Sequence, residues 1–325
     1  MTTTNVTGGA ATADALTSDT SGPLASDTAN ADAGRVTAPV RGTGGRRPAD
    51  GAPRALRGAW ARLRRTEPTL VLAVGVVAVV LAWALLPGLF TSHDPVVGVP
   101  ADKLQAPSAA HPFGTDALGR DLLARVIHGA GESLTGALVA VGVGLVVGTA
   151  LGVLAGSAGR IVDDVIMRVV DVLLSIPSLL LMLSVLILLG FGTTNAAIAV
   201  GVSSVASFAR LSRSEVVRVR RSDYVEAAFA GGARFLPVLW RHVLPNSAGA
   251  VVSLAALQFG TAVIAISTLG FLGYGAPPPT PEWGLLIAEG RNYIATSWWL
   301  TTLPGLVLVA VVLSANRISV ALRRS

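Results

Sequence analysis

Six long apolar stretches constrain this chain more than any other feature of its sequence. Each is close to the length of about 20 helical residues that crosses the ~30 Å hydrocarbon core of a bilayer. They cover residues 69–90, 134–157, 169–190, 195–211, 247–270 and 298–316. Charged residues make up only 14% of the chain, against about 25% in soluble domains. The sequence therefore predicts an all-α membrane protein with six transmembrane helices.

The basic residues predict how these helices are oriented. With the N-terminus in the cytoplasm, the cytoplasmic segments carry 9, 2, 7 and 3 lysines and arginines, and the outer segments carry 3, 0 and 1. Cytoplasmic segments of membrane proteins are enriched in Lys and Arg, so both termini are predicted to be cytoplasmic. Inside the third stretch, Pro177 removes a backbone hydrogen-bond donor and predicts a kink.

Composition divides the chain into two regions. Residues 1–66 are rich in Thr, Ala, Gly, Ser and Asp, and they have too few large apolar side chains to form a core. They are predicted to be a disordered cytoplasmic tail. Residues 67–325 form the predicted six-helix domain, with a cytoplasmic loop at 212–245 and outer loops at 91–133 and 271–297.

The second stretch carries a ladder of small residues at a spacing of four. Its members are Gly136, Ala140, Gly144, Gly148, Gly152 and Gly156. Small residues at this spacing allow a second helix to approach closely. The ladder predicts that this helix has a tightly packed partner.

Several kinds of function have no residues to support them. No ionisable residue lies well inside a predicted span, so no group is available to bind a coupling ion, and the energy for transport is expected to come from outside the membrane domain. Gln258, in mid-span, either lines a passage or bonds another helix, and we expect the bond. The chain has no cysteine, no H-E-x-x-H, no G-x-S-x-G and no phosphate-binding P-loop. We expect no catalytic residue, no metal site and no bound cofactor.

The cytoplasmic loop is too long to be a simple connection. Residues 222–235 predict a short amphipathic helix, which Ser222 or Asp223 can cap and Pro237 limits. One predicted face of this helix carries Tyr224, Ala228, Gly231 and Phe235, and Glu226 projects from the opposite side. Such a helix can lie on a membrane or dock into a groove of a partner protein.

Three segments of the chain resemble a known family. Glu226-Ala227-Ala228, followed by Gly232 and by Leu244-Pro245, resembles the EAA loop of bacterial ABC importer permeases. Two outer segments are similar to those of the C-type subunit of dipeptide and oligopeptide permeases. The first contains Gly114, Thr115, Asp116, Gly119, Arg120 and Asp121, and the second contains Pro281, Glu282, Trp283 and Gly284. The resemblance covers residues 67–325.

The resemblance implies an ABC type I importer permease fold in the bacterial cytoplasmic membrane, and a subunit that is not itself an enzyme. It implies four kinds of contact: with membrane lipid, with a second, B-type permease, with two ABC ATPase subunits that use ATP and Mg, and with an extracytoplasmic peptide-binding protein. It implies no nucleic acid. In this family the EAA loop couples the permease to the ATPase. The residues expected to do so here are Tyr224, Glu226, Ala227, Ala228, Gly232, Leu244 and Pro245.

Three other functions stay open at this point. The nearest is a nickel or other metal-chelate importer with the same architecture. The second is an exporter or channel that works alone, and the third is an intramembrane enzyme, against which the missing catalytic pairs argue. For Asp116, Arg120 and Asp121, contact with an outside partner and pairing with one another both remain possible.

Overall fold

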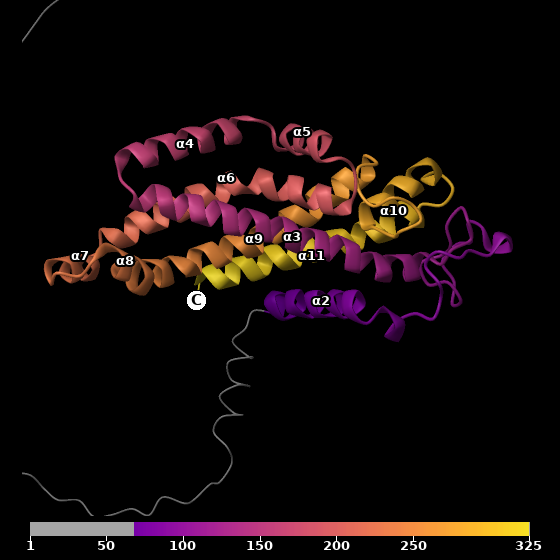
Figure 1. Ribbon diagram of the computed structural model, residues 1–325. Helices are drawn as coiled ribbons and strands as arrows, with labels where there is room; N and C mark the ends of the chain where they lie inside the picture. The colour runs from indigo at the N-terminus through magenta and orange to yellow at the C-terminus, as the bar shows by residue number, and fades with distance from the viewer. Residues whose placement is uncertain (1–67, 325) are drawn as a thin grey trace, which may run out of the picture. The chain divides into compact units, whose positions relative to one another are not determined.

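The described part of the chain is a bundle of helices (Figure 1). The computed structural model describes residues 68–324, which lie within one of two compact units of the chain. These residues contain no β-strand. The predicted tail at 1–66 lies outside the described residues. The helices are α2 (Pro68–Leu85), α3 (Leu122–Ser157), α4 (Arg160–Ser175), α5 (Ser178–Leu189), α6 (Thr193–Arg220), α7 (Asp223–Ala230), α8 (Phe235–Val238), α9 (Leu244–Phe271), α10 (Trp283–Gly290) and α11 (Trp299–Arg324).

Helices α3 and α6 form the most extensive helix pair in the described bundle. The ladder of small residues on α3 makes their close approach possible. A Cβ atom built on Gly148 would lie 2.5 Å from Phe208 Cβ, and one built on Gly156 would lie 2.9 Å from Val216 Cγ1. Larger residues on α3 would therefore push α6 away. The predicted tight partner is confirmed, and it is α6.

The third predicted span consists of two helices, α4 and α5, which are bent by 101° relative to each other. Pro177 is the N-cap residue of α5, and Ile176 before it has extended backbone angles (φ −84°, ψ 131°). The ring of a proline disfavours helical angles in the residue before it. The predicted kink is confirmed, and it is large enough to break the helix.

Four described helices are long and apolar enough to cross a membrane alone, and the bent α4–α5 pair would add a fifth span. The four are α2, α3, α9 with the π-helical turn before it, and α11. The remaining predicted span, 195–211, lies within α6. This helix has 28 residues, but arginines and serines lower its hydropathy, and α3, α5 and α9 pack around it.

The predicted outer loop at 271–297 contains the helix α10, which packs against α3, α9 and α11. Trp283 is fully buried, and its Nε1–H donates to the backbone oxygen of Val126 at 3.0 Å. The carboxylate of Glu282 caps α10 by accepting from the backbone N–H groups of Gly284 and Leu285, each at 2.9 Å. This segment is thus a packed part of the bundle.

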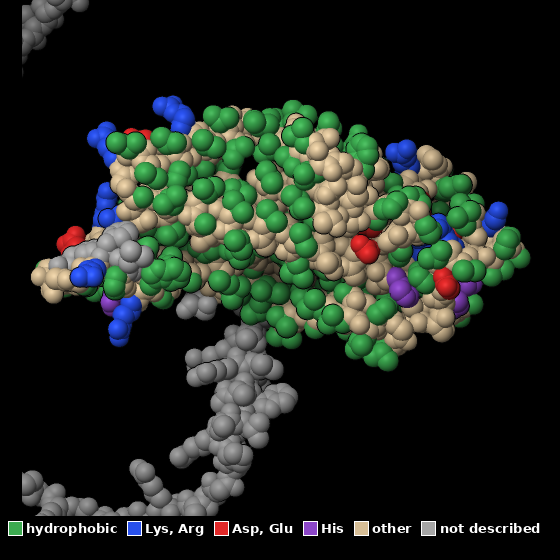
Figure 2. All heavy atoms as spheres, viewed as in Figure 1, with side chains coloured by type: hydrophobic (Ala, Val, Ile, Leu, Met, Phe, Trp, Pro, Cys, Tyr) green, Lys and Arg blue, Asp and Glu red, His purple; other side chains and the backbone are tan. Residues whose placement is uncertain are grey.

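Side chains of different kinds gather in different zones of the described region (Figure 2). Hydrophobic side chains cover its middle, and basic side chains gather at the end that carries α7 and the start of α4. The opposite end shows acidic, basic and histidine side chains together. Large apolar side chains such as Val146 and Leu188 are 69% and 85% exposed. An apolar surface of this extent is unfavourable in water, so the middle zone suits contact with lipid or with another apolar chain.

Candidate functional site

The helix α7 is shorter than the sequence predicted. It ends at Ala230, whereas the prediction extended it to residue 235. Gly232 takes a left-handed conformation (φ 84°), and the N–H of Ala233 donates to the carbonyl of Ala228 at 3.1 Å. This is the usual way in which a glycine ends a helix. The Gly231-Gly232 pair therefore stops the helix before Pro237 can.

The buried face of α7 also differs from the prediction. Val225 is fully buried in a cluster with Val216, Val219, Val238, Leu239 and Val243, and Ala228 packs against this cluster. Tyr224, which was predicted on the same face as Ala228, is 47% exposed. Glu226 and Ala227 are exposed as well. Val225 anchors α7. In the tripeptide Glu226-Ala227-Ala228, the side chains of Glu226 and Ala227 are exposed.

The start of α9 lies beside α7. Leu244 packs against the Val225 cluster, and Pro245 is the second residue of α9, directly after a π-helical turn at Leu239–Val243. The ring of Tyr224 meets the ring of His242 edge to face, with centroids 6.4 Å apart. The residues predicted for coupling are therefore gathered at one end of the bundle.

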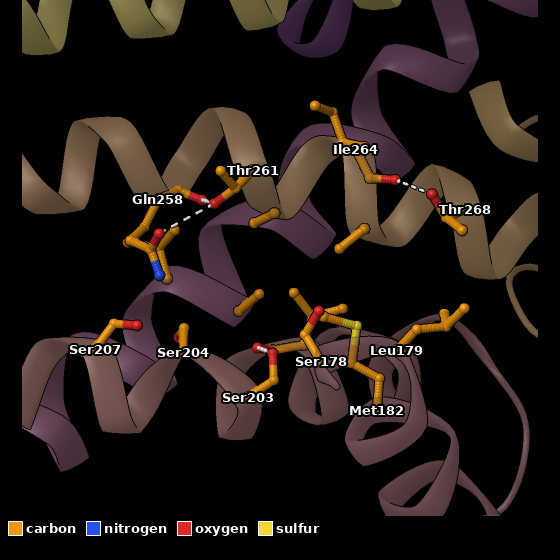
Figure 3. Close-up of a pocket in the computed structure, with 15 residues that line it drawn as sticks. Ser178, Leu179, Met182, Ser203, Ser204, Ser207, Gln258, Thr261, Ile264 and Thr268 are labelled. Carbon is orange, nitrogen blue, oxygen red and sulfur yellow. Dashed lines mark hydrogen bonds between the residues drawn. The ribbon is translucent and has the colours of Figure 1, made fainter. Parts of the chain in front are cut away.

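A cavity of about 400 Å³ lies between α9 and the α5–α6 pair (Figure 3). Its lining surface is mainly apolar, and hydroxyl and amide side chains contribute the polar part: Ser178, Ser203, Ser204, Ser207, Gln258, Thr261 and Thr268. Gln258 accepts at its Oε1 from Thr261 Oγ1 at 3.2 Å, within the same helix. Within the described residues Gln258 forms no hydrogen bond to another helix, and its side chain lines the cavity.

A second cavity of about 580 Å³ adjoins the first, because Ser207 lines both. Its walls come from α4, α6 and α9, and they include Leu174, Arg210, Ser214 and Leu254. We call the two cavities together the α6–α9 groove. The groove runs between these helices toward the end that carries α7.

Four charged side chains form an ion-pair cluster at the opposite end. Asp116 accepts from Arg120 Nε at 2.6 Å and from Arg125 Nη1 at 3.3 Å. Glu289, on α10, lies 3.3 Å from Arg120 Nη2 and 3.2 Å from Arg125 Nη2. Burial raises the pKa of Glu289, and the charge of Arg120 opposes this. We call these four residues the α10 ion-pair cluster, because they link α10 to the start of α3 and the turn before it.

The other residues of the first outer motif shape the turn before α3. Gly114 and Gly119 have φ angles of 73° and 76°, which favour glycine. Thr115 accepts from the N–H of Gln105 at 2.8 Å. Asp121 caps α3 by accepting from the N–H of Ala124 at 2.7 Å, and it also pairs with His111 at 2.8 Å. Of the two alternatives left open for the charged residues of this motif, the structure shows pairing within the chain.

The second outer motif holds α10 in place. Glu282 is fully buried and accepts from Ser133 Oγ on α3 at 3.3 Å. Burial raises the pKa of Glu282, and the N–H groups of Gly284 and Leu285 oppose this. A Cβ built on Gly284 would lie 2.6 Å from the Cα of Ser267 on α9. Pro281 is also buried, next to Glu282.

Sequence reasoning missed two members of the α10 ion-pair cluster, Arg125 and Glu289. Arg125 lies inside the apolar run at 122–127, and Glu289 directly follows the apolar run at 285–288. A charged residue next to such a run is usually paired, and this was the available signal. It did not identify the partner, because the two residues belong to helices far apart in the sequence.

Comparison with known proteins places the chain in a family. Residues 148–325 match the family described as binding-protein-dependent transport system inner membrane component. The dipeptide transport system permease protein DppC of Alkalihalophilus pseudofirmus is 38% identical over 267 residues, covering 82% of this chain and 88% of that protein. The di/tripeptide transport system permease protein DppC of Pseudomonas aeruginosa is 41% identical over 224 residues, covering 69% and 74%.

A solved structure has a similar fold. The MetNI methionine ABC transporter, in inward-facing conformations, contains a chain that matches with a TM-score of 0.51 at 20% identity, covering 61% of this chain and 96% of that chain. At this identity the likeness concerns the fold alone. The resemblance noted in the EAA loop and the outer motifs is confirmed at the level of the family. This chain belongs to the inner membrane components of binding-protein-dependent transport systems, and it is a permease with the fold of an ABC type I importer.

Proposed function

We propose that this chain is one of two non-identical membrane subunits of an ATP-driven importer of dipeptides or oligopeptides. Both curated relatives described above are permeases of peptide transport systems, and this supports a peptide substrate. A nickel or metal-chelate importer is not favoured for the same reason. A channel that works alone, or an intramembrane enzyme, does not fit a family defined by binding-protein-dependent transport.

The proposed topology has six transmembrane helices in a domain at 67–325, with both termini in the cytoplasm of a bacterium. The spans would be α2, α3, the α4–α5 pair, α6, α9 and α11. The gathering of basic side chains at the α7 end supports a cytoplasmic location for that end (Figure 2). Helix α6 has low hydropathy for a span, but α3, α4, α5 and α9 pack against it and reduce its contact with lipid.

The proposed coupling element is α7 with the start of α9. Tyr224, Glu226 and Ala227 are exposed and available to a cleft in an ATPase subunit. ATP and Mg would bind to the two ATPase subunits, while this chain would bind no cofactor. Closure of the ATPases would move α7, and α6 and α9 on either side of it would tilt and open the passage outward. Such coupling requires that the ATPase contact α7 differently in the two states.

The observation that carries this proposal is the α6–α9 groove. It places hydroxyl and amide groups between the two helices that flank α7 along the chain. Polar groups in a span cost free energy unless they line a pathway or pair with each other. We therefore take the groove as this chain's share of the passage, with the B-type permease covering its open side and an extracytoplasmic binding protein delivering the peptide.

Purification followed by reconstitution tests the proposal. The tagged chain is extracted in mild detergent, and the co-purifying proteins are identified by mass spectrometry. We expect a second permease and ATPase subunits. The complex and its binding protein are then placed in liposomes, and the uptake of a labelled dipeptide is compared with that of nickel. Uptake of the peptide that requires ATP supports the proposal. Recovery of the chain alone, or uptake of nickel without peptide, would overturn it.

A further inference from the structure

Three hydroxyl groups that line the α6–α9 groove use their hydrogen atoms in bonds within their own helices. Ser203 and Thr268 donate to carbonyls of their own helices at 2.7 and 2.8 Å (Figure 3). Ser204 donates to the carbonyl of Gly201 at 2.8 Å. A hydroxyl oxygen that donates its hydrogen in this way keeps lone pairs that can accept. These positions are suited to accept hydrogen bonds from the N–H and ammonium groups of a peptide.

Arg210 gives the groove its charge. It is the one charged side chain among the described residues that line the two cavities. Its Nη2 pairs with a carboxylate oxygen of Asp171 on α4, and the side chains are 52% and 61% exposed. An ion pair as exposed as this contributes little to stability. The fold alone therefore gives little reason for an arginine at this place.

A neighbouring pair provides the contrast. Arg213, one turn later on α6, donates from Nε and Nη2 to both carboxylate oxygens of Asp163 on α4, each at 2.6 Å. Arg213 lines neither cavity. Two Arg–Asp pairs thus join α6 to α4. The Arg213–Asp163 pair has two hydrogen bonds and lies outside the groove. The Arg210–Asp171 pair has one and lies at the wall of the groove.

We propose that Arg210 is a selectivity residue of the passage, which exchanges Asp171 for carboxylate groups of the passing peptide. The inference rests on the proposed import of peptides and adds a substrate preference to it. A substrate carboxylate offers the guanidinium the same charge-assisted hydrogen bonds that Asp171 does. The groove therefore favours acidic peptides over basic ones, in addition to any preference of the binding protein.

The test compares the uptake of two labelled dipeptides, one containing glutamate and one containing lysine, by the reconstituted complex. The acidic-to-basic uptake ratio is measured for each variant with the same binding protein, so the binding protein's own preference cancels. Arg210→Gln should lower this ratio about fivefold and Arg210→Glu should lower it further, whereas Arg210→Lys should keep it within about twofold. Asp171→Asn removes the competing carboxylate and should raise the ratio about threefold.

Arg213→Gln is the matched control, because it removes the same charge from the same helix outside the groove. It should leave the ratio unchanged. Equal shifts in Arg210→Gln and Arg213→Gln would show a general charge effect and overturn the proposal, as would an unchanged ratio in Arg210→Gln and Arg210→Glu. If the complex with Arg210→Gln does not assemble, the acidic-to-basic uptake ratio of Asp171→Asn tests the proposal instead. An unchanged ratio in Asp171→Asn would contradict the exchange of Asp171 for substrate carboxylates. A wild-type complex that imports neither dipeptide would overturn the proposed function, and this inference with it.

Discussion

The two ends of the described bundle hold their short helices in different ways. Helix α10 is fixed by a buried tryptophan, by a buried capping carboxylate and by ion pairs from Glu289 to two arginines. Helix α7 is held by one fully buried side chain, Val225, among its described residues. Regions with few buried contacts open at lower free energy. We therefore expect α7 to move against the bundle more readily than α10, as the proposed coupling role requires.

The largest effect on stability is expected at Arg125. Arg125→Ala removes a fully buried charge and leaves Glu289 without one of its two partners. Breaking a buried ion pair in this way costs about 3–5 kcal/mol of unfolding free energy. Thermal unfolding of the purified protein in detergent measures this.

A double variant sharpens that experiment. Arg125→Met with Glu289→Met removes both charges, so fewer buried charges are left without a partner. It should be more stable than Arg125→Ala, since apolar replacement of a buried pair is often tolerated. If the two proteins unfold at the same temperature, the α10 ion-pair cluster does not hold α10 as described.

A smaller effect is expected at the other end of the bundle. Val225→Ala removes two buried methyl groups and should lower the free energy of opening of α7 by about 2 kcal/mol. Hydrogen exchange should become faster in α7 and stay unchanged in α10, which serves as the internal reference. Equal acceleration at both ends would mean that the ends are not independent.

The pH dependence of stability tests the buried cap of α10. Burial raises the pKa of Glu282 in the folded protein above its usual value. A raised pKa stabilises the fold below the usual carboxyl range, and this stabilisation is lost as the pH rises through the folded pKa. Relative to Glu282→Gln, the wild type should therefore lose stability as the pH rises. Melting temperatures of both proteins from about pH 4 to 8 measure this, and parallel curves would contradict the assignment.

The smallest effect on stability, and the most severe effect on transport, is expected at Glu226. Glu226→Lys changes an exposed side chain and should alter the unfolding free energy by less than about 0.5 kcal/mol. Peptide uptake should nevertheless be abolished, because the charge at the proposed contact with the ATPase is reversed. Normal uptake would contradict the coupling assignment.

Gly232→Asp tests the same element through its backbone. The left-handed angles at Gly232 suit glycine, so a side chain there should cost about 1 kcal/mol locally and displace the end of α7. Membrane insertion should remain intact while uptake is lost. Immunoblots of membrane fractions and uptake assays separate the two quantities.

Features encoded within a few residues could be predicted from the sequence. The ladder that includes Gly148 predicted a tight helix contact, and Pro177 predicted a kink at the place where the structure breaks between α4 and α5. The end of α7 could also have been predicted from its neighbouring residues, because Gly231-Gly232 precedes Pro237. The functional roles of the exposed residues of α7, such as Tyr224 and Glu226, stay predictions.

Features that depend on helix pairing could not be predicted in this way. The groove exists because Ser207 and Gln258, on different helices, face one cavity, and the partner of Arg125 comes from α10. Apolar side chains in a membrane helix do not mark which side faces lipid, since lipid and protein are both apolar. The cavity position of Gln258 likewise depends on how α9 packs against α5 and α6.

The break at Pro177 bears on how the chain enters the membrane during synthesis. The 12 residues of α5 extend only ~18 Å, and the 16 residues of α4 carry charges, so neither half is a span by itself. Insertion of the α4–α5 pair is therefore expected to depend on α6, which is synthesised next. Synthesis of α6 supplies Arg213, whose clamp on Asp163 neutralises a charge on α4. These three helices are expected to leave the insertion machinery as one unit.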